Sequence, residues 1–191
     1  MKKLNQIIIN GMYLYLAILI MTNIIQHPNI IFEFHNNCDL ERWKIIDDFV
    51  MGGKSDGSIK LDKNGNGIFS GHISIENNGG FSSIQLVNIE KVEVDPKDSI
   101  ELNLRGDGGV FQFRLKNSKL NRHSYTYRFK TSKSWEKILI PLNDMQPSYR
   151  GLKLQMPNFN GKKIESLGFL KSSKENIDFN LVIKSIKIMK Y

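Results

Sequence analysis

The chain has 191 residues, of which 40% are hydrophobic and 10% aromatic, enough for one domain with a sizeable core. Its single cysteine, Cys38, excludes an intrachain disulfide and therefore a small secreted scaffold built on disulfides. The formal net charge of +8 favours anionic partners, but the lysines are spread among apolar strand residues and no basic helix is evident. We therefore expect a solvated basic surface and no nucleic-acid partner.

Residues 1–29 are expected to form a separate signal or anchor segment. Lys2 and Lys3 precede an apolar stretch, residues 7–25, which as a helix would span about 28 Å, close to the thickness of a hydrocarbon core. A positive flank before an apolar segment is typical of a signal peptide or a signal anchor. No convincing small-x-small cleavage site precedes His27, which favours an uncleaved membrane anchor, with a cleaved and exported chain as the alternative. Translation from Met21 would instead leave a cytoplasmic protein.

Residues 30–191 contain short runs with alternating apolar and polar side chains. In chain order, the expected strands cover residues 31–34, 43–47, 58–61, 68–76, 81–87, 100–105, 111–115, 125–129, 135–141, 164–170 and 179–189. Their even spacing, without an amphipathic helix longer than two turns, predicts an all-β fold, an antiparallel sandwich. The stretch from Asn143 to Gly161 is expected to be irregular.

The clearest alternation predicts the core. The expected core residues are Ile100, Leu102, Leu104, Phe111, Phe113 and Leu115. Ile73 and Ile75 are expected on one face of a hairpin. In the last run the apolar phase changes between Ile183 and Ile186, which predicts a β-bulge near Lys184.

Two segments with paired glycines separate expected strands. The first is DDFVMGGKS (47–55) and the second is ENNGGFSS (76–83). Glycine tolerates a positive φ and the close approach of a ligand, so we expect tight connections with these glycines at φ > 0. Their N–H groups can hold an anion, and the neighbouring polar side chains can bind a partner's backbone. Alternatively, the two loops lock onto each other, with an aspartate capping turn N–H groups.

No motif predicts catalysis or a metal site. Residues 53–55 lack the earlier glycine of a phosphate-binding loop, because Asp48 stands in its place. The turn that begins at Asp62 resembles the start of a calcium loop, but Ile73 stands where a bidentate glutamate is needed. There is no nucleophile elbow, no facing carboxylate pair and no metal-ligand spacing among the histidines. We expect no catalytic residue, no metal ligand and no cofactor, and thus a protein that is not an enzyme.

Several segments occur in a recognisable order. They are Trp43, DDFVMGGKS (47–55), FSGHISIENNGGFSS (69–83), RGDGGVFQFRL (105–115), Tyr127-Arg128-Phe129, WEKILIPLNDMQPSYRG (135–151) and SLGFL (166–170). Together they resemble the complex I intermediate-associated protein 30 family over residues 31–191. The resemblance implies a galactose-binding-domain-like jelly roll, in agreement with the strand pattern. It also implies non-enzymatic work, because mitochondrial members act as chaperones, with unfolded-protein binding, in assembling respiratory complex I.

We therefore expect a protein-binding module that holds a protein client, such as respiratory-complex subunits or assembly intermediates. The residues expected to contact this partner are Asp47, Asp48, Met51, Gly52, Gly53, Ser55, Asn77, Asn78, Gly79, Gly80 and Arg150. Residues 7–25 are expected to contact a membrane.

Carbohydrate binding is the alternative function, because many jelly rolls of this type carry it. Such sites need exposed aromatic platforms. Trp43, Trp135, Tyr149 and Phe159 are the candidates, but the two tryptophans lie in alternating strands that favour the core.

Overall fold

The computed structural model describes residues 29–87, 89 and 91–191, so the segment expected to contact a membrane, residues 7–25, lies outside the described residues. Within the described ranges the chain forms 15 strands and four short 3-10 helices. None of the helices found there has the length and apolar character needed to cross a membrane. The expected all-β, antiparallel sandwich is confirmed.

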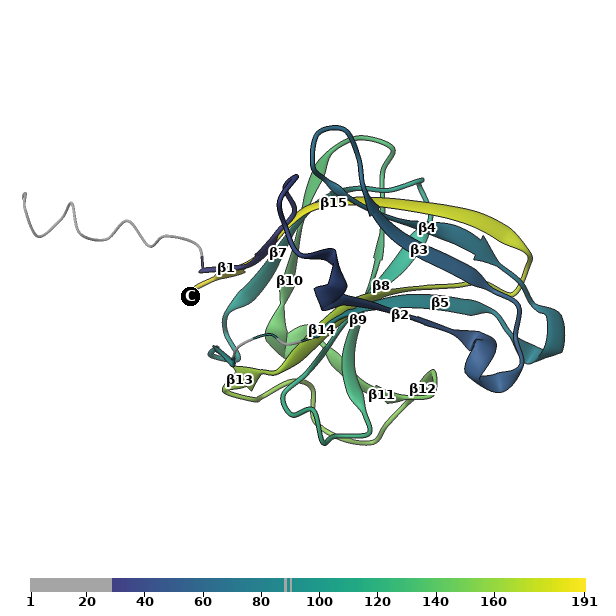
Figure 1. Cartoon of the computed structure of the whole chain (residues 1–191). Coiled ribbons are helices and arrows are strands. Elements are labelled where there is room, and N and C mark those ends of the chain that lie inside the picture. The colour runs from purple at the N-terminus through teal and green to yellow at the C-terminus, as the bar shows by residue number, and fades with distance from the viewer. Residues whose placement is uncertain (1–28, 88, 90) are drawn as a thin grey trace, which may run out of the picture.

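Two large antiparallel sheets face each other (Figure 1). The six-stranded sheet follows the order β10 (Glu136–Pro141), β7 (Ser99–Arg105), β15 (Ile177–Met189), β4 (Gly67–Ile73) and β3 (Asp56–Leu61), with β1 (Asn29–Glu33) also paired to β15. The seven-stranded sheet follows the order β12 (Leu152–Lys153), β11 (Gln146–Tyr149), β9 (Ser124–Lys130), β8 (Val110–Lys116), β14 (Ser166–Ser172), β5 (Phe81–Leu86) and β2 (Trp43–Asp47). A small pair joins β6 (Val92–Glu93) to β13 (Lys163–Ile164).

The core lies between the two large sheets. The six residues that the alternation predicts, on β7 and β8, are all essentially inaccessible to solvent, because successive side chains of a strand point to opposite faces. Aromatic rings from both ends of the chain meet there: the ring centroids of Phe34 and Trp43 lie 5.4 Å apart, and those of Phe113 and Phe169 also lie 5.4 Å apart. The expected bulge is confirmed, because the register of β15 against β7 shifts between Ile183 and Ser185.

Three expectations about local structure are wrong. Residues 143–161 contain β11 and β12, which the sequence pattern hides because they are short and Pro147, which has no N–H, interrupts the first. Ile75 is exposed because β4 ends at Ile73 and the chain then turns into the 3-10 helix η3 (Glu76–Asn78). Trp135 is 43% exposed because it precedes β10 and so does not belong to the alternating strand. The guanidinium of Arg105 lies over its ring, 5.6 Å from the ring centroid.

Candidate partner-binding surface

Asp48 joins the two Gly-Gly segments. It begins the 3-10 helix η2 (Asp48–Met51) and is fully buried. Its Oδ1 accepts a hydrogen bond from the backbone N–H of Ser55 at 3.0 Å, and its Oδ2 accepts one from the Ser55 hydroxyl at 2.5 Å. Oδ2 also accepts the N–H groups of Gly80 at 2.6 Å and Phe81 at 3.1 Å. One carboxylate therefore holds together loops that are 32 positions apart.

The environment of Asp48 keeps its carboxyl group ionised. Burial raises the pKa of Asp48, but the hydrogen bonds from the Ser55 hydroxyl and from the N–H groups of Gly80, Phe81 and Ser55 lower it by more in total. The resulting pKa lies below the ordinary value for aspartate. At neutral pH the loops are thus held by a charged acceptor, which makes stronger hydrogen bonds than a neutral one.

The glycines of the two segments serve two different purposes. Gly52 and Gly80 have φ values of +86° and +128°, as expected. Gly53 and Gly79 do not have positive φ, which corrects the expectation for these two positions. Both make room for Asp48: a Cβ at Gly53 would overlap Oδ1 of Asp48, and a Cβ at Gly79 would lie 2.7 Å from Oδ2.

Further contacts complete the loop cluster, the name used here for residues 47–57 and 74–81. The side-chain amide of Asn77 donates to the carbonyl of Gly52 at 3.0 Å, and Asp47 accepts from the N–H of Gly57 at 3.1 Å. The ammonium of Lys54 lies 2.5 Å from a carboxylate oxygen of Glu76 at the surface.

The structure brings ten of the eleven expected site residues into this cluster. Four of these ten residues are buried, namely Asp48, Gly53, Ser55 and Gly80. Gly52, Asn77 and Asn78 are exposed. The backbone of Met51 belongs to η2. Arg150 is the exception, because it lies in the turn between β11 and β12. The buried members thus have a structural role, and the exposed members lie at the surface, where the Asn77 amide is already bonded to the Gly52 carbonyl.

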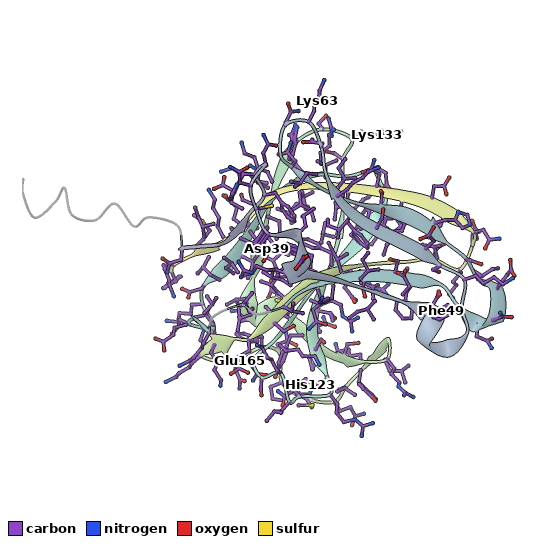
Figure 2. All side chains as sticks on the ribbon, viewed as in Figure 1. Asp39, Phe49, Lys63, His123, Lys133 and Glu165 are labelled. Atoms are coloured by element: carbon purple, nitrogen blue, oxygen red, sulfur yellow. The ribbon has the colours of Figure 1, made fainter. Side chains whose placement is uncertain are left out.

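Phe49 is an exposed aromatic residue of the loop cluster that was not among the expected site residues. Its side chain is 80% exposed although its neighbour Asp48 is fully buried. Figure 2 shows it on the η2 loop at the edge of the molecule. The sequence could have predicted this exposure, because Phe49 lies in a turn segment outside the alternating runs and no strand face can bury it.

A hollow of about 300 Å³ lies on the outer face of the seven-stranded sheet. On β8, β14 and β5 the core residues Leu115, Phe169 and Ile84 alternate with outward residues that line the hollow. Four cationic side chains contribute to the lining, namely Arg114, Lys116, Arg122 and Arg150, and no Asp or Glu is among its described lining residues. We call this feature the basic groove. In Figure 1, β11 and β12 lie below β5 and β14, on the side away from the first sheet.

Tyr149 organises one wall of the basic groove. Its hydroxyl accepts a hydrogen bond from Nη2 of Arg122 at 3.0 Å, and the guanidinium groups of Arg122 and Arg150 lie 5.2 Å and 5.5 Å from its ring centroid. The hydrogen bond from Arg122 is the main reason that the pKa of Tyr149 lies below its ordinary value. A second hollow on this sheet, of about 450 Å³, includes Asp144 beside Lys153, so its charges are mixed.

The described residues hold no group of three or more His, Cys, Asp or Glu side chains that could bind a metal ion. The two surfaces are suited to binding: one has an exposed aromatic side chain beside the hydrogen-bonded Asp48, and the other is a hollow lined by cations.

Several solved structures share the fold of this chain. A family 11 carbohydrate-binding module from Clostridium thermocellum, in complex with a β-1,3-1,4-mixed-linked tetrasaccharide, has a TM-score of 0.64 at 14% identity, over 85% of this chain and 95% of that one. A family 29 carbohydrate-binding module gives 0.51 at 9% identity, over 86% and 91%. An exo-β-agarase gives 0.57 at 10% identity, over 86% of this chain and 25% of that one. The fold is therefore the galactose-binding-like β-sandwich of such modules.

The family follows from the sequence itself. Residues 32–183 match the family model described as complex I intermediate-associated protein 30 (CIA30), and the chain belongs to this family. No curated protein sequence matches the chain.

Proposed function

We propose that this domain is a non-enzymatic module that binds a protein partner during the assembly of respiratory complex I. Membership of the CIA30 family over residues 32–183 is the observation that carries this proposal, because the family is a non-catalytic assembly-factor domain. The client would be a subunit or an assembly intermediate of the complex, held in the manner of a chaperone.

The exposed part of the loop cluster is the surface that we assign to the partner. Phe49 is a large apolar side chain in water, and burying a phenylalanine fully against a partner contributes about 1.5–3 kcal/mol. Aromatic anchors of this kind carry much of the energy of protein interfaces. The hydrogen bonds of Asp48 tie the backbone next to Phe49 to Gly80 and Phe81, which reduces the freedom that this segment would lose on binding. Gly52, Asn77 and Asn78 supply backbone and amide groups around this anchor.

A membrane position suits such a task. We propose that residues 7–25, preceded by Lys2 and Lys3, keep the domain at the membrane in which a respiratory complex is assembled. The apolar composition and length of this stretch support the proposal.

Co-purification from native membranes tests the protein-binding proposal. The tagged full-length protein is recovered beside two variants, Phe49→Ser and Leu120→Ser, and the bound proteins are identified by mass spectrometry. Leu120 is the matched control because it is 92% exposed and lies between β8 and β9, outside the loop cluster. We expect complex I subunits with the wild type and the control and a loss of about tenfold with Phe49→Ser. Recovery without such subunits, or equal recovery by both variants, would contradict the proposal.

Carbohydrate binding is the second candidate function. It is supported by the fold shared with carbohydrate-binding modules and by Tyr149, which lines the basic groove. Trp43 and Phe159 are buried in the core and cannot serve as platforms, whereas Trp135 is partly exposed. A glycan array distinguishes the two functions. Carbohydrate binding would be favoured if the protein binds one neutral glycan and if this binding is lost on Tyr149→Ala but unaffected by Phe49→Ser.

A further inference from the structure

The basic groove concentrates positive charge, and its described lining residues include no acid. The registers of the seven-stranded sheet set Gln85, Gly168 and Arg114 side by side across β5, β14 and β8. The same registers set Ser166 beside Lys116. Gly168 has no side chain, and a Cβ there would overlap the carbonyl oxygen of Ile84, so the floor of the groove stays open between Gln85 and Arg114.

Arg114 is the most unusual residue in the groove. Its Nε is buried and has no hydrogen-bond partner, and the described ranges of the chain supply its guanidinium with no ion pair. Burial lowers the pKa of Arg114, and burial together with the neighbouring Arg114 lowers the pKa of Lys116. Arg114 is partly buried, and a buried N–H group without a partner destabilises the folded state, so the position of its Nε is difficult to explain by stability.

The two other arginines, Arg122 and Arg150, line the wall of the groove that contains Tyr149. Arg150 has a positive φ of 50°, a conformation that is uncommon for a residue other than glycine, and Gly151 follows at 80°. This turn between β11 and β12 places Arg150 against Tyr149, where Arg122 also lies. Backbone strain of this kind is frequent at binding sites.

The chemistry of the groove favours an oxyanion. The planar guanidinium of arginine presents two N–H groups that match two oxygens of a carboxylate or a phosphate, and the carboxylate is the form that an unmodified protein partner supplies. A flat membrane surface does not reach a recessed Nε, and a volume of about 300 Å³ is too small for a nucleic-acid duplex. The groove is continuous with the loop cluster, because Phe81 lines the groove and its N–H binds Asp48.

We propose that the basic groove is an anion site that takes a carboxylate group from an acidic segment of the partner protein. That the carboxylate comes from the partner protein rests on the proposed function. The site itself rests on the four cations, on the absence of acids among its described lining residues and on the unpartnered Nε of Arg114. A partner that buries Phe49 against itself would place its neighbouring segment along β5 and into the groove.

Calorimetric titration of the full-length protein tests the assignment. The probes are a hexaglutamate peptide, a hexaglutamine peptide of the same length, inorganic phosphate and phosphatidylglycerol vesicles. The variants are Arg114→Met, Arg122→Met and the matched control Arg105→Met, which removes the same charge from β7 of the other sheet. Arg122 is exposed, so Arg122→Met should fold normally. This variant can therefore test the groove even if Arg114→Met does not fold.

We expect the hexaglutamate peptide to bind and the hexaglutamine peptide not to bind. Each groove variant should lower the affinity for the hexaglutamate peptide about tenfold or more. The affinity of Arg105→Met should stay within about twofold of the wild type. The melting temperature of Arg114→Met should equal or exceed that of the wild type, because the lost charge had no partner.

Four results would overturn the assignment: no binding of hexaglutamate, equal losses in groove and control variants, preferential binding of phosphate, or preferential binding of vesicles. A fall of several degrees in the melting temperature of Arg114→Met, with peptide binding unchanged in Arg122→Met, would also overturn it. The proposed function has its own test, the co-purification of complex I subunits. A recovery that depends on Phe49 would support that function even if hexaglutamate does not bind to the groove.

Discussion

The carboxylate of Asp48 occupies the space that a side chain at position 53 would need. A Cβ on Gly53 would overlap Oδ1, Cγ and Cβ of Asp48, and the N–H of Gly53 in turn donates to the backbone carbonyl of Asp48 at 3.1 Å. The two residues are therefore coupled: the small residue permits the buried acid, and the acid holds the two loops of the cluster together.

Gly53→Ala should destabilise the domain by overlap rather than by backbone strain. We expect a loss of about 1–3 kcal/mol in the free energy of unfolding, because the fully buried Asp48 has no room to move aside. Gly52→Ala should cost about 1 kcal/mol through its positive φ alone, since no atom lies within 4 Å of its Cβ position. Urea unfolding of both variants checks this order. A larger loss for Gly52→Ala than for Gly53→Ala would contradict it.

Asp48→Asn should lower stability and leave partner capture intact per folded molecule. The amide replaces a charged acceptor of four hydrogen bonds and turns a donor toward other donors, which should cost about 2–4 kcal/mol. Asp56→Asn is the control, because Asp56 is exposed and its replacement should change stability by no more than about 0.5 kcal/mol. Reduced capture at an unchanged melting temperature would show instead that Asp48 contacts the partner.

The stabilisation by Asp48 should depend on pH in a defined direction. Its pKa in the folded state lies below that in the unfolded state, so the unfolded chain binds more protons as the pH falls. The contribution should be fully present above the unfolded pKa, about 3.9, and should be lost as the pH falls through the folded value. Unfolding curves of the wild type and Asp48→Asn from neutral to acidic pH should therefore converge. A gap between the two proteins that stays constant would refute this linkage.

Phe113→Ala and Phe49→Ala should have opposite profiles. Phe113 is fully buried against Phe169, so its truncation should cost about 3–5 kcal/mol through lost burial and the cavity left behind. Phe49 is 80% exposed, and its truncation should change stability by no more than about 0.5 kcal/mol while weakening partner capture. Parallel measurement of the melting temperature and of co-purified protein distinguishes the two roles. A strongly destabilised Phe49→Ala would remove Phe49 from the proposed interface.

Residues 7–25 should direct the protein to a membrane, with Lys2 and Lys3 on the cytoplasmic side. Cell fractionation of the full-length chain beside a chain that starts at Asn29 tests this. The full-length chain should sediment with membranes and the shorter chain should not. The same distribution for both chains would exclude a role of this segment in anchoring.

Local patterns in the sequence predicted the core, because the alternation of a strand depends only on neighbouring residues. Phe111 and Leu115 are buried as the period of two requires. Short elements were missed: β11 has four residues, one of them Pro147, which leaves no alternation to detect. Trp135 was misplaced because it lies just before the first residue of β10.

The candidate sites depend on contacts between distant segments, which a single sequence does not reveal. Asp47 and Asp48 are adjacent and chemically identical, yet only the second accepts the N–H groups of Gly80 and Phe81. The basic groove requires β8 and β11 to lie in one sheet on either side of β9, which brings Arg114 and Arg150 to one hollow. Both residues lie in segments that carry the family resemblance, and Arg150 was an expected contact residue, but their spacing in the sequence does not show that they line one hollow.

The position of β15 has a consequence for how the protein is made. Among the described strands β15 comes last in sequence, yet it lies between β7 and β4 and is also the strand with which β1 pairs. During translation the earlier strands of this sheet leave the ribosome before the strand that joins them exists. The sheet can therefore close only after β15 has been synthesised, and a chain that stops before β15 has open strand edges, which favour aggregation or proteolysis.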